Sequence, residues 1–201
     1  MVAAVQNFLN SCAVSFDLPI LDWIQANLQS SFMDTFMPIV TVLGDAGLFW
    51  IAWAVLLLLF PKTRKIGLGM GFALIMGLLV CNVTLKPMIA RIRPYDFQEQ
   101  EFGILINLLI DRQHDFAFPS GHTIASFEAA TVLLKNSKKM GIPAMILAFI
   151  IAFSRLYLYV HYPTDVIFSV FAGILFAFIG DALAGLAAPK LAPKKRGKYE
   201  A

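Results

Sequence analysis

The stretch IGLGMGFALIMGLLVCNVTL, residues 66–85, contains twenty residues and no charged side chain. A helix of about twenty mainly apolar residues is long enough to cross the hydrocarbon core of a bilayer. The rest of the chain fits this interpretation, because 59% of its 201 residues are hydrophobic and only 14% are charged. In a typical soluble domain, about a quarter of the residues are charged. The stretch therefore predicts a helical membrane protein.

Four less pure apolar segments accompany this stretch, approximately at residues 39–60, 122–134, 142–159 and 166–188. The segment 122–134 is short for a membrane span, so its assignment depends partly on its neighbours. Cys12 and Cys81 lie in apolar surroundings and indicate packing, not a disulfide framework. We predict an all-α, multi-pass bundle of about five transmembrane helices, which forms one domain over residues 39–188.

The chain before this domain, residues 1–38, is expected to lie on the membrane. In the segment DLPILDWIQANL, Pro19 suits the first position of a helix, and apolar residues then recur at helical spacing on one face. This pattern is typical of an amphipathic helix in the interface. A sixth span is the alternative, and Asp17 and Asp22 argue against it because they interrupt the apolar run.

The basic residues predict which way the protein faces. Eleven of the 16 lysines and arginines follow the first, third and fifth expected spans: Lys62, Arg64, Lys65, Lys135, Lys138, Lys139, Lys190, Lys194, Lys195, Arg196 and Lys198. These positions share one side of the membrane if all five segments cross it. Since positive charges favour the cytoplasmic side, we expect a cytoplasmic C-terminus with a basic tail at residues 189–201.

The other five basic residues lie in or beside the segments on the opposite side: Lys86, Arg91, Arg93, Arg112 and Arg155. They cannot serve as topology signals there, and an anion is the simplest ligand that would hold them. Three stretches on this side carry polar chemistry: KPMIARIRP at residues 86–94, PSGH at 119–122 and SRLYLYVHYPTD at 154–165. The predicted topology brings all three to the extracytoplasmic face.

The residue types in these stretches favour a phosphate site. Lys86, Arg93 and Arg155 offer three cations, two of them planar forks that match phosphate oxygens. Ser120 and Gly121 stand at the start of a predicted helix, where backbone N–H groups and the helix dipole attract an anion. A metal site built from the histidines is the rival interpretation, and three nearby cations disfavour a divalent ion. We therefore expect neither a metal nor another cofactor.

The two histidines of these stretches predict catalysis. In HYPTD, Pro163 suits the first helical position, so Asp165 falls in the first turn and its carboxylate reaches back toward the residue ahead of the helix. That geometry lets Asp165 accept the Nδ1–H of His161 and leaves Nε2 free as a nucleophile. His122, beside the cradle, can protonate a leaving group and later deprotonate a water. Taken singly, each residue also suits a helix cap or an interfacial anchor.

The combination resembles the type-2 phosphatidic acid phosphatase family of membrane lipid phosphatases. The resemblance rests on three motifs, K-x6-R-P, P-S-G-H and S-R-x5-H-x3-D, which match in order and spacing over residues 86–165. It implies that His161 forms a phosphohistidine, that Asp165 orients it and that His122 is the acid and then the base. It also implies that Lys86, Arg93, Ser120, Gly121 and Arg155 bind the phosphoryl oxygens without a metal. Arg91 falls at a variable position of the first motif.

The resemblance further implies an enzyme of the plasma membrane whose partners are the bilayer and a lipid phosphate, with no nucleic acid and no obligate protein partner. Small bacterial members commonly act on undecaprenyl pyrophosphate, phosphatidylglycerophosphate or phosphatidate, and the outward-facing site favours the first. A lipid phosphotransferase with the same residues and a non-enzymatic receptor for anionic lipids are the alternatives. Glu128 and Asp181 lie within expected spans, where ionisable residues are functional or paired with one another.

Overall fold

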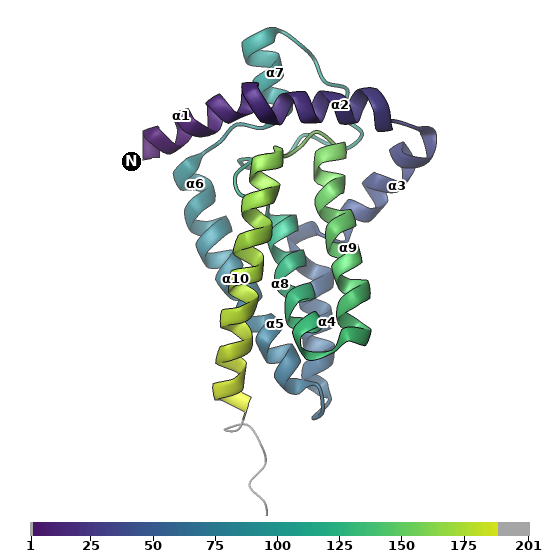
Figure 1. Ribbon diagram of the computed structural model, residues 1–201, viewed down its shortest axis with the longest axis vertical. Coiled ribbons are helices and arrows are strands. Elements are labelled where there is room, and N and C mark those ends of the chain that lie inside the picture. Colours follow the sequence, from purple (N-terminus) through teal and green to yellow (C-terminus); the bar gives the residue numbers. More distant parts are fainter. Residues whose placement is uncertain (1, 189–201) are drawn as a thin grey trace, which may run out of the picture.

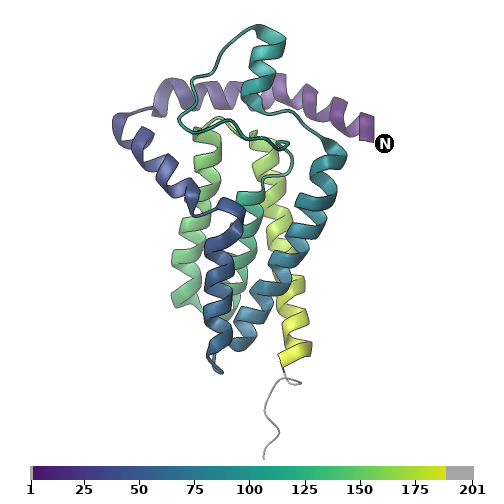
Figure 2. The same cartoon turned by 180° about the vertical axis from the view of Figure 1, so that it is seen from behind.

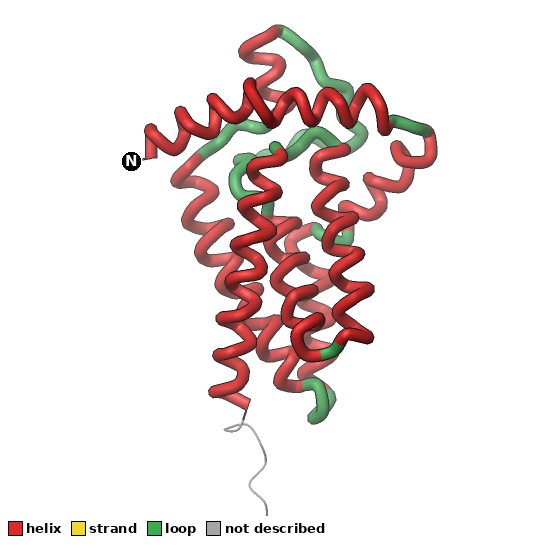
Figure 3. The backbone as a smooth tube through the Cα atoms, viewed as in Figure 1, coloured by secondary structure: helices red, strands yellow, loops and turns green. Residues whose placement is uncertain are grey.

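The computed structural model describes residues 2–188, so the predicted basic tail lies outside the described residues. Over the described range the chain forms helices, turns and loops, with no strand (Figure 3). The prediction of an all-α fold is confirmed. The division into an N-terminal segment, a membrane domain and a tail stays a prediction.

The N-terminal helices lie across one end of the bundle. Helix α1 (Val2–Cys12), the π-helical turn η1 (Ala13–Asp17) and α2 (Leu18–Leu28) follow one another directly and run crosswise to the other helices (Figure 1). Their buried side chains face the bundle, while Phe16 and Trp23 are exposed. The amphipathic character agrees with the sequence, but the helix begins at Val2, well before Pro19.

The expected span at residues 39–60 is broken. Helix α3 (Ser31–Val42) is followed by the short 3-10 turn η2 (Asp45–Gly47) and by α4 (Leu48–Leu59), with a bend of 42° at the break. Ala46 and Gly47 have positive φ angles of 49° and 66°, which end the regular helix. The polar residue Asp45 lies at this bend, between α3 and α4.

The stretch that predicted the membrane fold forms α5 (Arg64–Met76) and the π-helix η3 (Gly77–Leu85), which continues into α6 (Lys86–Ile89). The helix stops at Ala90, whose φ angle is 48°. Helix α7 (Pro94–Phe102) then lies beyond α1 and α2 at the end of the molecule (Figure 2). The loop at residues 103–120 leads from it back into the bundle.

Helix α8 (Gly121–Asn136) is the centre of the bundle, and it packs against α9 (Lys138–Tyr157), α10 (Pro163–Ala187) and α5. Small residues let the outer pair α5 and α10 approach closely. A Cβ added at Gly180 would lie 2.6 Å from the carbonyl oxygen of Gly69, so a larger residue does not fit at this spacing. The outward faces of α4, α9 and α10 carry exposed large apolar side chains, as lipid contact requires.

Within residues 2–188, three helical segments are long and apolar enough to cross a membrane: Arg64–Phe102, Lys138–Tyr157 and Pro163–Ala187. The bent pair α3 and α4 adds a fourth if it counts as one span. Helix α8 has 16 residues, fewer than a full crossing needs. The protein is therefore a multi-pass membrane protein, and the number of five spans stays a prediction.

The two ends of the bundle differ in chemistry. The turns α4–α5 and α8–α9, with Lys62 and Lys138 in or beside them, lie at the end opposite to α1 and α2 (Figure 1). The three polar stretches, at residues 86–94, 119–122 and 154–165, lie toward the end that α1 and α2 cover. The separation predicted from the charges therefore appears in the fold.

Candidate active site

The three polar stretches surround one cavity of about 420 Å³. Six of the eight predicted site residues line it: Lys86, Arg93, Gly121, His122, Arg155 and His161. Ser120 and Asp165 lie behind its wall, fully buried. Residues separated by up to 79 positions in the chain thus converge because four helix ends, those of α6, α8, α9 and α10, meet at this level of the bundle.

His161 occupies the short connection between α9 and α10 and is only 1% exposed. Its Nε2 lies 3.1 Å from Nη1 of Arg93, so this nitrogen accepts the hydrogen bond and the proton belongs on Nδ1. Nδ1 lies 3.6 Å from Oδ2 of Asp165 and has no hydrogen-bond partner among the described residues. The expected bond between His161 and Asp165 is therefore approached but not formed at this distance.

Three residues on the open side of His161 form what we call the cavity-side network: Lys86, Arg93 and Asp115. The Asp115 carboxylate pairs with Lys86 through one oxygen and with Arg93 through the other. Arg93 also donates to the carbonyls of Asp115 at 3.0 Å and of Val160 at 2.6 Å. A carboxylate thus lies between two of the cations that were predicted to bind phosphate.

Arg155, the third predicted cation, reaches the cavity from the last turn of α9. Its Nη1 donates to Oγ1 of Thr41 at 2.5 Å, and its Nε is buried without a partner among the described residues. The carbonyl of Arg155 accepts the N–H groups of Val160 and His161 at 3.2 and 3.3 Å. The same residue therefore offers N–H donors to the cavity and fixes the backbone of the nucleophile candidate.

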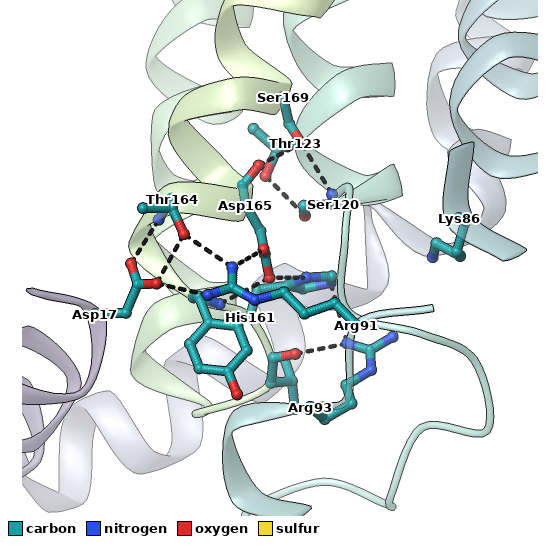
Figure 4. A network of polar contacts seen from close by, with 12 residues as sticks. Asp17, Lys86, Arg91, Arg93, Ser120, Thr123, His161, Thr164, Asp165 and Ser169 are labelled. Carbon is teal, nitrogen blue, oxygen red and sulfur yellow. Dashed lines mark hydrogen bonds and ion pairs between the residues drawn. The ribbon is translucent and has the colours of Figure 1, made fainter. Parts of the chain in front are cut away.

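The PSGH stretch forms the N-terminus of α8 against α10. The Ser120 N–H donates to Oγ of Ser169 at 2.9 Å, and the Ser120 hydroxyl accepts from Thr123 at 3.0 Å (Figure 4). Ser169 in turn donates to the Asp165 carbonyl at 2.6 Å. Gly121 lines the cavity, whereas the Ser120 side chain makes its contacts away from it, so Ser120 positions the turn.

His122 faces the cavity from the second position of α8. Its Nε2 lies 2.8 Å from Oδ1 of Asp45, the polar residue at the bend between α3 and α4. Gly44 also leaves room for the imidazole, because a Cβ added at this glycine would lie 2.5 Å from the His122 ring. Asp45 therefore fixes the orientation of the predicted acid.

Behind His161 lies a second cluster, which we call the buried network: Asp17, Arg91 and Asp165. The Arg91 guanidinium pairs with Oδ1 of Asp165 through Nη1 and with Oδ2 of Asp17 through Nη2, the latter at 2.8 Å (Figure 4). All three side chains are at most 2% exposed. The Asp165 carboxylate also caps α10 by accepting the Tyr162 N–H at 3.0 Å, as the predicted capping geometry requires.

Among the groups outside the helical spans, His161 and Asp115 have pKa shifts that bear on the site. Burial, together with the positive charges of Arg93 and Arg155, lowers the pKa of His161 well below its ordinary value. Partial burial raises the pKa of the Asp115 carboxyl, but the hydrogen bond from Lys86 and the charge of Arg93 outweigh it, so the pKa is lowered overall. At neutral pH His161 is therefore neutral and Asp115 is ionised.

Sequence reasoning missed Asp17, Asp45, Asp115 and Ser169. From the sequence alone, Asp17 appears only as an interruption of an apolar run. A signal was nevertheless present, because a carboxylate in an apolar helix is expensive to bury unless a cation pairs with it. The glycines on either side of Asp45 are likewise a breaker signal inside an expected span.

The two in-span acids are not paired with one another. Asp181 pairs with Lys135 at 2.7 Å and accepts from Asn136 at 2.9 Å, near the far end of the bundle. Glu128 lines the cavity beyond His122, is 1% exposed, and its Oε1 has no hydrogen-bond partner among residues 2–188. Of the two possibilities, the mutual pair is not formed, and a functional role stays a prediction.

Comparison with known proteins gives the family. The model of the PAP2 superfamily matches residues 66–183, which is more than half of the chain and contains every predicted site residue. The chain belongs to the PAP2 superfamily. The family predicted from the three motifs is therefore confirmed.

Relatives within the PAP2 superfamily extend this result. The chain is 35% identical over 131 residues to an undecaprenyl-diphosphatase of Sulfolobus acidocaldarius, a match that covers 65% of this chain and 61% of that protein. The crystal structure of LpxE from Aquifex aeolicus superposes with a TM-score of 0.69 and 26% identity, over 83% of this chain and 94% of that one. A transmembrane PAP2-type phosphatidylglycerolphosphate phosphatase from Bacillus subtilis shares the fold, with a TM-score of 0.67 and 24% identity over 96% and 93% of the two chains.

Proposed function

We propose that this PAP2 protein is a metal-independent lipid phosphatase that hydrolyses a polyprenyl pyrophosphate, with undecaprenyl pyrophosphate as the first choice. The observation that carries the proposal is the position of His161: its Nε2 faces a cavity whose wall contains Lys86, Arg93 and Arg155. A nucleophile surrounded by three cations suits attack on a phosphoryl group, whose charge the cations neutralise. Three cations would also repel a divalent metal.

The chemistry proceeds in two displacements. The lone pair of His161 Nε2 attacks the terminal phosphorus, and the bond from phosphorus to the bridging oxygen breaks. His122 gives its proton to that oxygen, so a lipid monophosphate leaves and a phosphohistidine remains. His122 then takes a proton from water, the hydroxide attacks phosphorus, and the bond to Nε2 breaks to release inorganic phosphate. Asp45 keeps the His122 ring oriented, and Asp165 orients His161 when the distance of 3.6 Å to Nδ1 shortens to a hydrogen bond.

The substrate phosphate replaces Asp115 in the cavity-side network. The Asp115 side chain is 53% exposed and belongs to the loop at residues 103–120, so it can move aside without opening the bundle. Its two oxygens pair with Lys86 and Arg93 as two phosphoryl oxygens would. Arg93, freed from the carboxylate and from Nε2, then binds the phosphoryl group as it transfers.

The lower part of the cavity suits a hydrocarbon chain. It continues from the site along apolar side chains of α4, α5 and η3, namely Ile51, Val55, Leu58, Leu74, Ile75 and Leu78. Such a wall lets the tail stay in an apolar environment while the phosphate enters the polar end. The geometry therefore favours a lipid over a water-soluble phosphate ester.

The distribution of basic residues supports a place in the plasma membrane, with the site on the extracytoplasmic face and the C-terminus in the cytoplasm. The support is the position of Lys62 and Lys138 at the end of the bundle opposite to the site, since cytoplasmic ends collect basic residues. An outward-facing site matches a carrier lipid that is released and recycled on that face.

A glycerolipid phosphate is the second candidate substrate, and Glu128 favours it. This carboxyl lies six residues beyond His122 on α8, about 9 Å along the helix, in an otherwise apolar part of the cavity. A protonated Glu128 would donate to an ester carbonyl or hydroxyl, groups that a polyprenyl chain lacks. Glu128→Leu should then reduce turnover of phosphatidylglycerophosphate or phosphatidate and spare undecaprenyl pyrophosphate.

The test is phosphate release by the purified protein in the presence of a chelator. Undecaprenyl pyrophosphate, phosphatidylglycerophosphate and phosphatidate are compared by kcat/KM, and the products are identified by mass. His122→Ala is the matched variant, and it should lose about 10²–10⁴-fold in rate because it removes the general acid. Transfer of phosphate to a second lipid would indicate a phosphotransferase. No release from any of the three by folded protein would contradict the proposal.

A further inference from the structure

The predicted orienting acid, Asp165, is itself oriented by other residues. Its Oδ1 pairs with Arg91 and its Oδ2 accepts the Tyr162 N–H, while His161 stays 3.6 Å away. The direction in which the carboxylate faces is therefore set by Arg91 and by the first turn of α10. A small change at Arg91 would turn the carboxylate relative to Nδ1 of His161.

Arg91 is held rigidly by partners on two other segments. Its Nη2 donates to the Leu9 carbonyl and to Asp17, and its Nη1 donates to Oγ1 of Thr164, each at 2.8 Å. The guanidinium also lies 3.7 Å from the centre of the Tyr162 ring. Four donors and one face of the planar group are thus used at once, which leaves the guanidinium one orientation.

The partners connect the N-terminal helix with α10. Leu9 belongs to α1 and Asp17 to η1, in the helix that lies across the end of the bundle. Asp17 additionally accepts the N–H of Thr164 at 2.9 Å and its hydroxyl at 2.8 Å. The helix that the sequence assigned to the membrane surface therefore reaches, through Asp17 and Arg91, to within one residue of the proposed catalytic pair.

The charges of the buried network also suit the chemistry. One guanidinium and two carboxylates carry a net charge of −1 behind His161. The imidazole gains positive charge when Nε2 bonds to phosphorus, and a nearby negative charge favours that change. A buried ion pair contributes little stability over an apolar replacement, so a requirement for geometry and charge explains this arrangement better than stability does.

We propose that Arg91 and Asp17 are positioning residues for the Asp165–His161 pair, and that Asp17 is the residue by which the N-terminal helix takes part in this positioning. This inference rests on the proposed phosphatase function. It differs from the motif-based assignment, which places Arg91 at a variable position and contains no residue before Lys86. Arg91 and Asp17 touch no substrate, because neither lines the cavity.

The test compares Arg91→Met, Arg91→Lys and Asp17→Asn with the wild type on the substrate with the highest kcat/KM. Arg91→Met should lower kcat by about 100-fold, the loss typical of a misplaced catalytic group. Arg91→Lys keeps the charge without the fork and should recover part of the loss. Asp17→Asn changes no shape and should lower kcat by about tenfold, since it removes one of the two carboxylates.

Inhibition by inorganic phosphate and a control variant distinguish a positioning role from a role in substrate binding or in folding. Inhibition by inorganic phosphate should be unchanged in all three variants, because the cavity-side network is intact. Asp22→Asn is the matched control: Asp22 lies on α2, accepts a hydrogen bond from Tyr159 at 2.6 Å and does not contact Arg91. It should retain wild-type kcat, although it also breaks a contact of the N-terminal helix.

Three results would overturn the inference. One is wild-type kcat in Arg91→Met. Another is weaker phosphate inhibition in step with the loss of kcat, which would place Arg91 in substrate binding. The third is an equal loss in Asp22→Asn and Asp17→Asn, which would indicate only helix docking. Absence of turnover in the wild type is a different outcome, since it would contradict the proposed function itself.

Discussion

On the cavity side of His161 one carboxylate pairs with two cations, and on the buried side one guanidinium pairs with two carboxylates. The two networks use the same chemistry in opposite arrangements. They differ most in exposure: the shared carboxylate of the cavity-side network is 53% exposed, whereas the shared guanidinium of the buried network is 2% exposed. An exposed pair is weak and exchangeable, whereas a buried one is costly to break on one side.

Under the proposed function, this difference gives the two networks different tasks. The cavity-side network can release its carboxylate and accept a phosphate in its place, so it serves binding. The side chains of the buried network are at most 2% exposed, so a lost partner leaves an uncompensated buried charge, and this network serves orientation. His161 lies between them, with Nε2 toward the first and Nδ1 toward the second.

The largest effect is expected at the residue between the networks. His161→Ala should lower kcat by about 10⁴-fold or more, because the nucleophile is lost while both networks stay in place. Steady-state phosphate release measures it. His114→Ala is the control, since His114 is exposed on the loop at residues 103–120. Substantial turnover by the His161 variant would mean that His161 is not the nucleophile.

The next effect breaks the cavity-side network. Arg93→Met should raise KM and weaken inhibition by inorganic phosphate by about 10- to 100-fold, because it removes charge-assisted hydrogen bonds to phosphate. Arg112→Met, which removes an exposed guanidinium that pairs with Asp96 and Glu99, should change neither. If Arg93→Met instead lowers only kcat, the division between binding and orientation is wrong.

Removing the carboxylate of the cavity-side network should have a smaller effect on phosphate inhibition, in the opposite direction. Asp115→Asn should strengthen phosphate inhibition by up to about fivefold, since it removes a partly exposed competitor whose ion pairs are worth about 1 kcal/mol or less. The measurement is the inhibition constant at constant ionic strength. Weaker inhibition would mean that the carboxylate helps to bind the substrate and is not replaced by it.

The smallest effect concerns pH. The lowered pKa of His161 means that the ring stays neutral, and therefore nucleophilic, below the ordinary histidine pKa of about 6.5. The profile of kcat/KM should therefore have its acid limb, where His161 gains a proton, below that value. An acid limb at or above the ordinary value would contradict the buried, cation-rich setting of His161.

Much of this arrangement was predictable from sequence because it follows from order along the chain. Apolar runs and the sides on which lysines collect place residues 86–94, 119–122 and 154–165 at one end of a bundle. Side-chain reach was not predictable. Asp17 contacts Arg91 only because a helix crosses the end of the bundle, and Asp45 meets His122 only because α3 and α4 bend. Neither contact is marked by a periodic pattern or by a fixed spacing of residues in the sequence.

Detection of phosphate on His161 tests the proposed phosphohistidine intermediate most directly. The reaction with the best lipid substrate is quenched in alkali during the first turnover, and the peptides are analysed by mass spectrometry under conditions that preserve phosphohistidine. We predict one phosphate on His161, present in the wild type, reduced in Arg91→Met and absent without substrate. An unmodified His161 in enzyme that is turning over, or phosphate carried by another residue, would contradict the account.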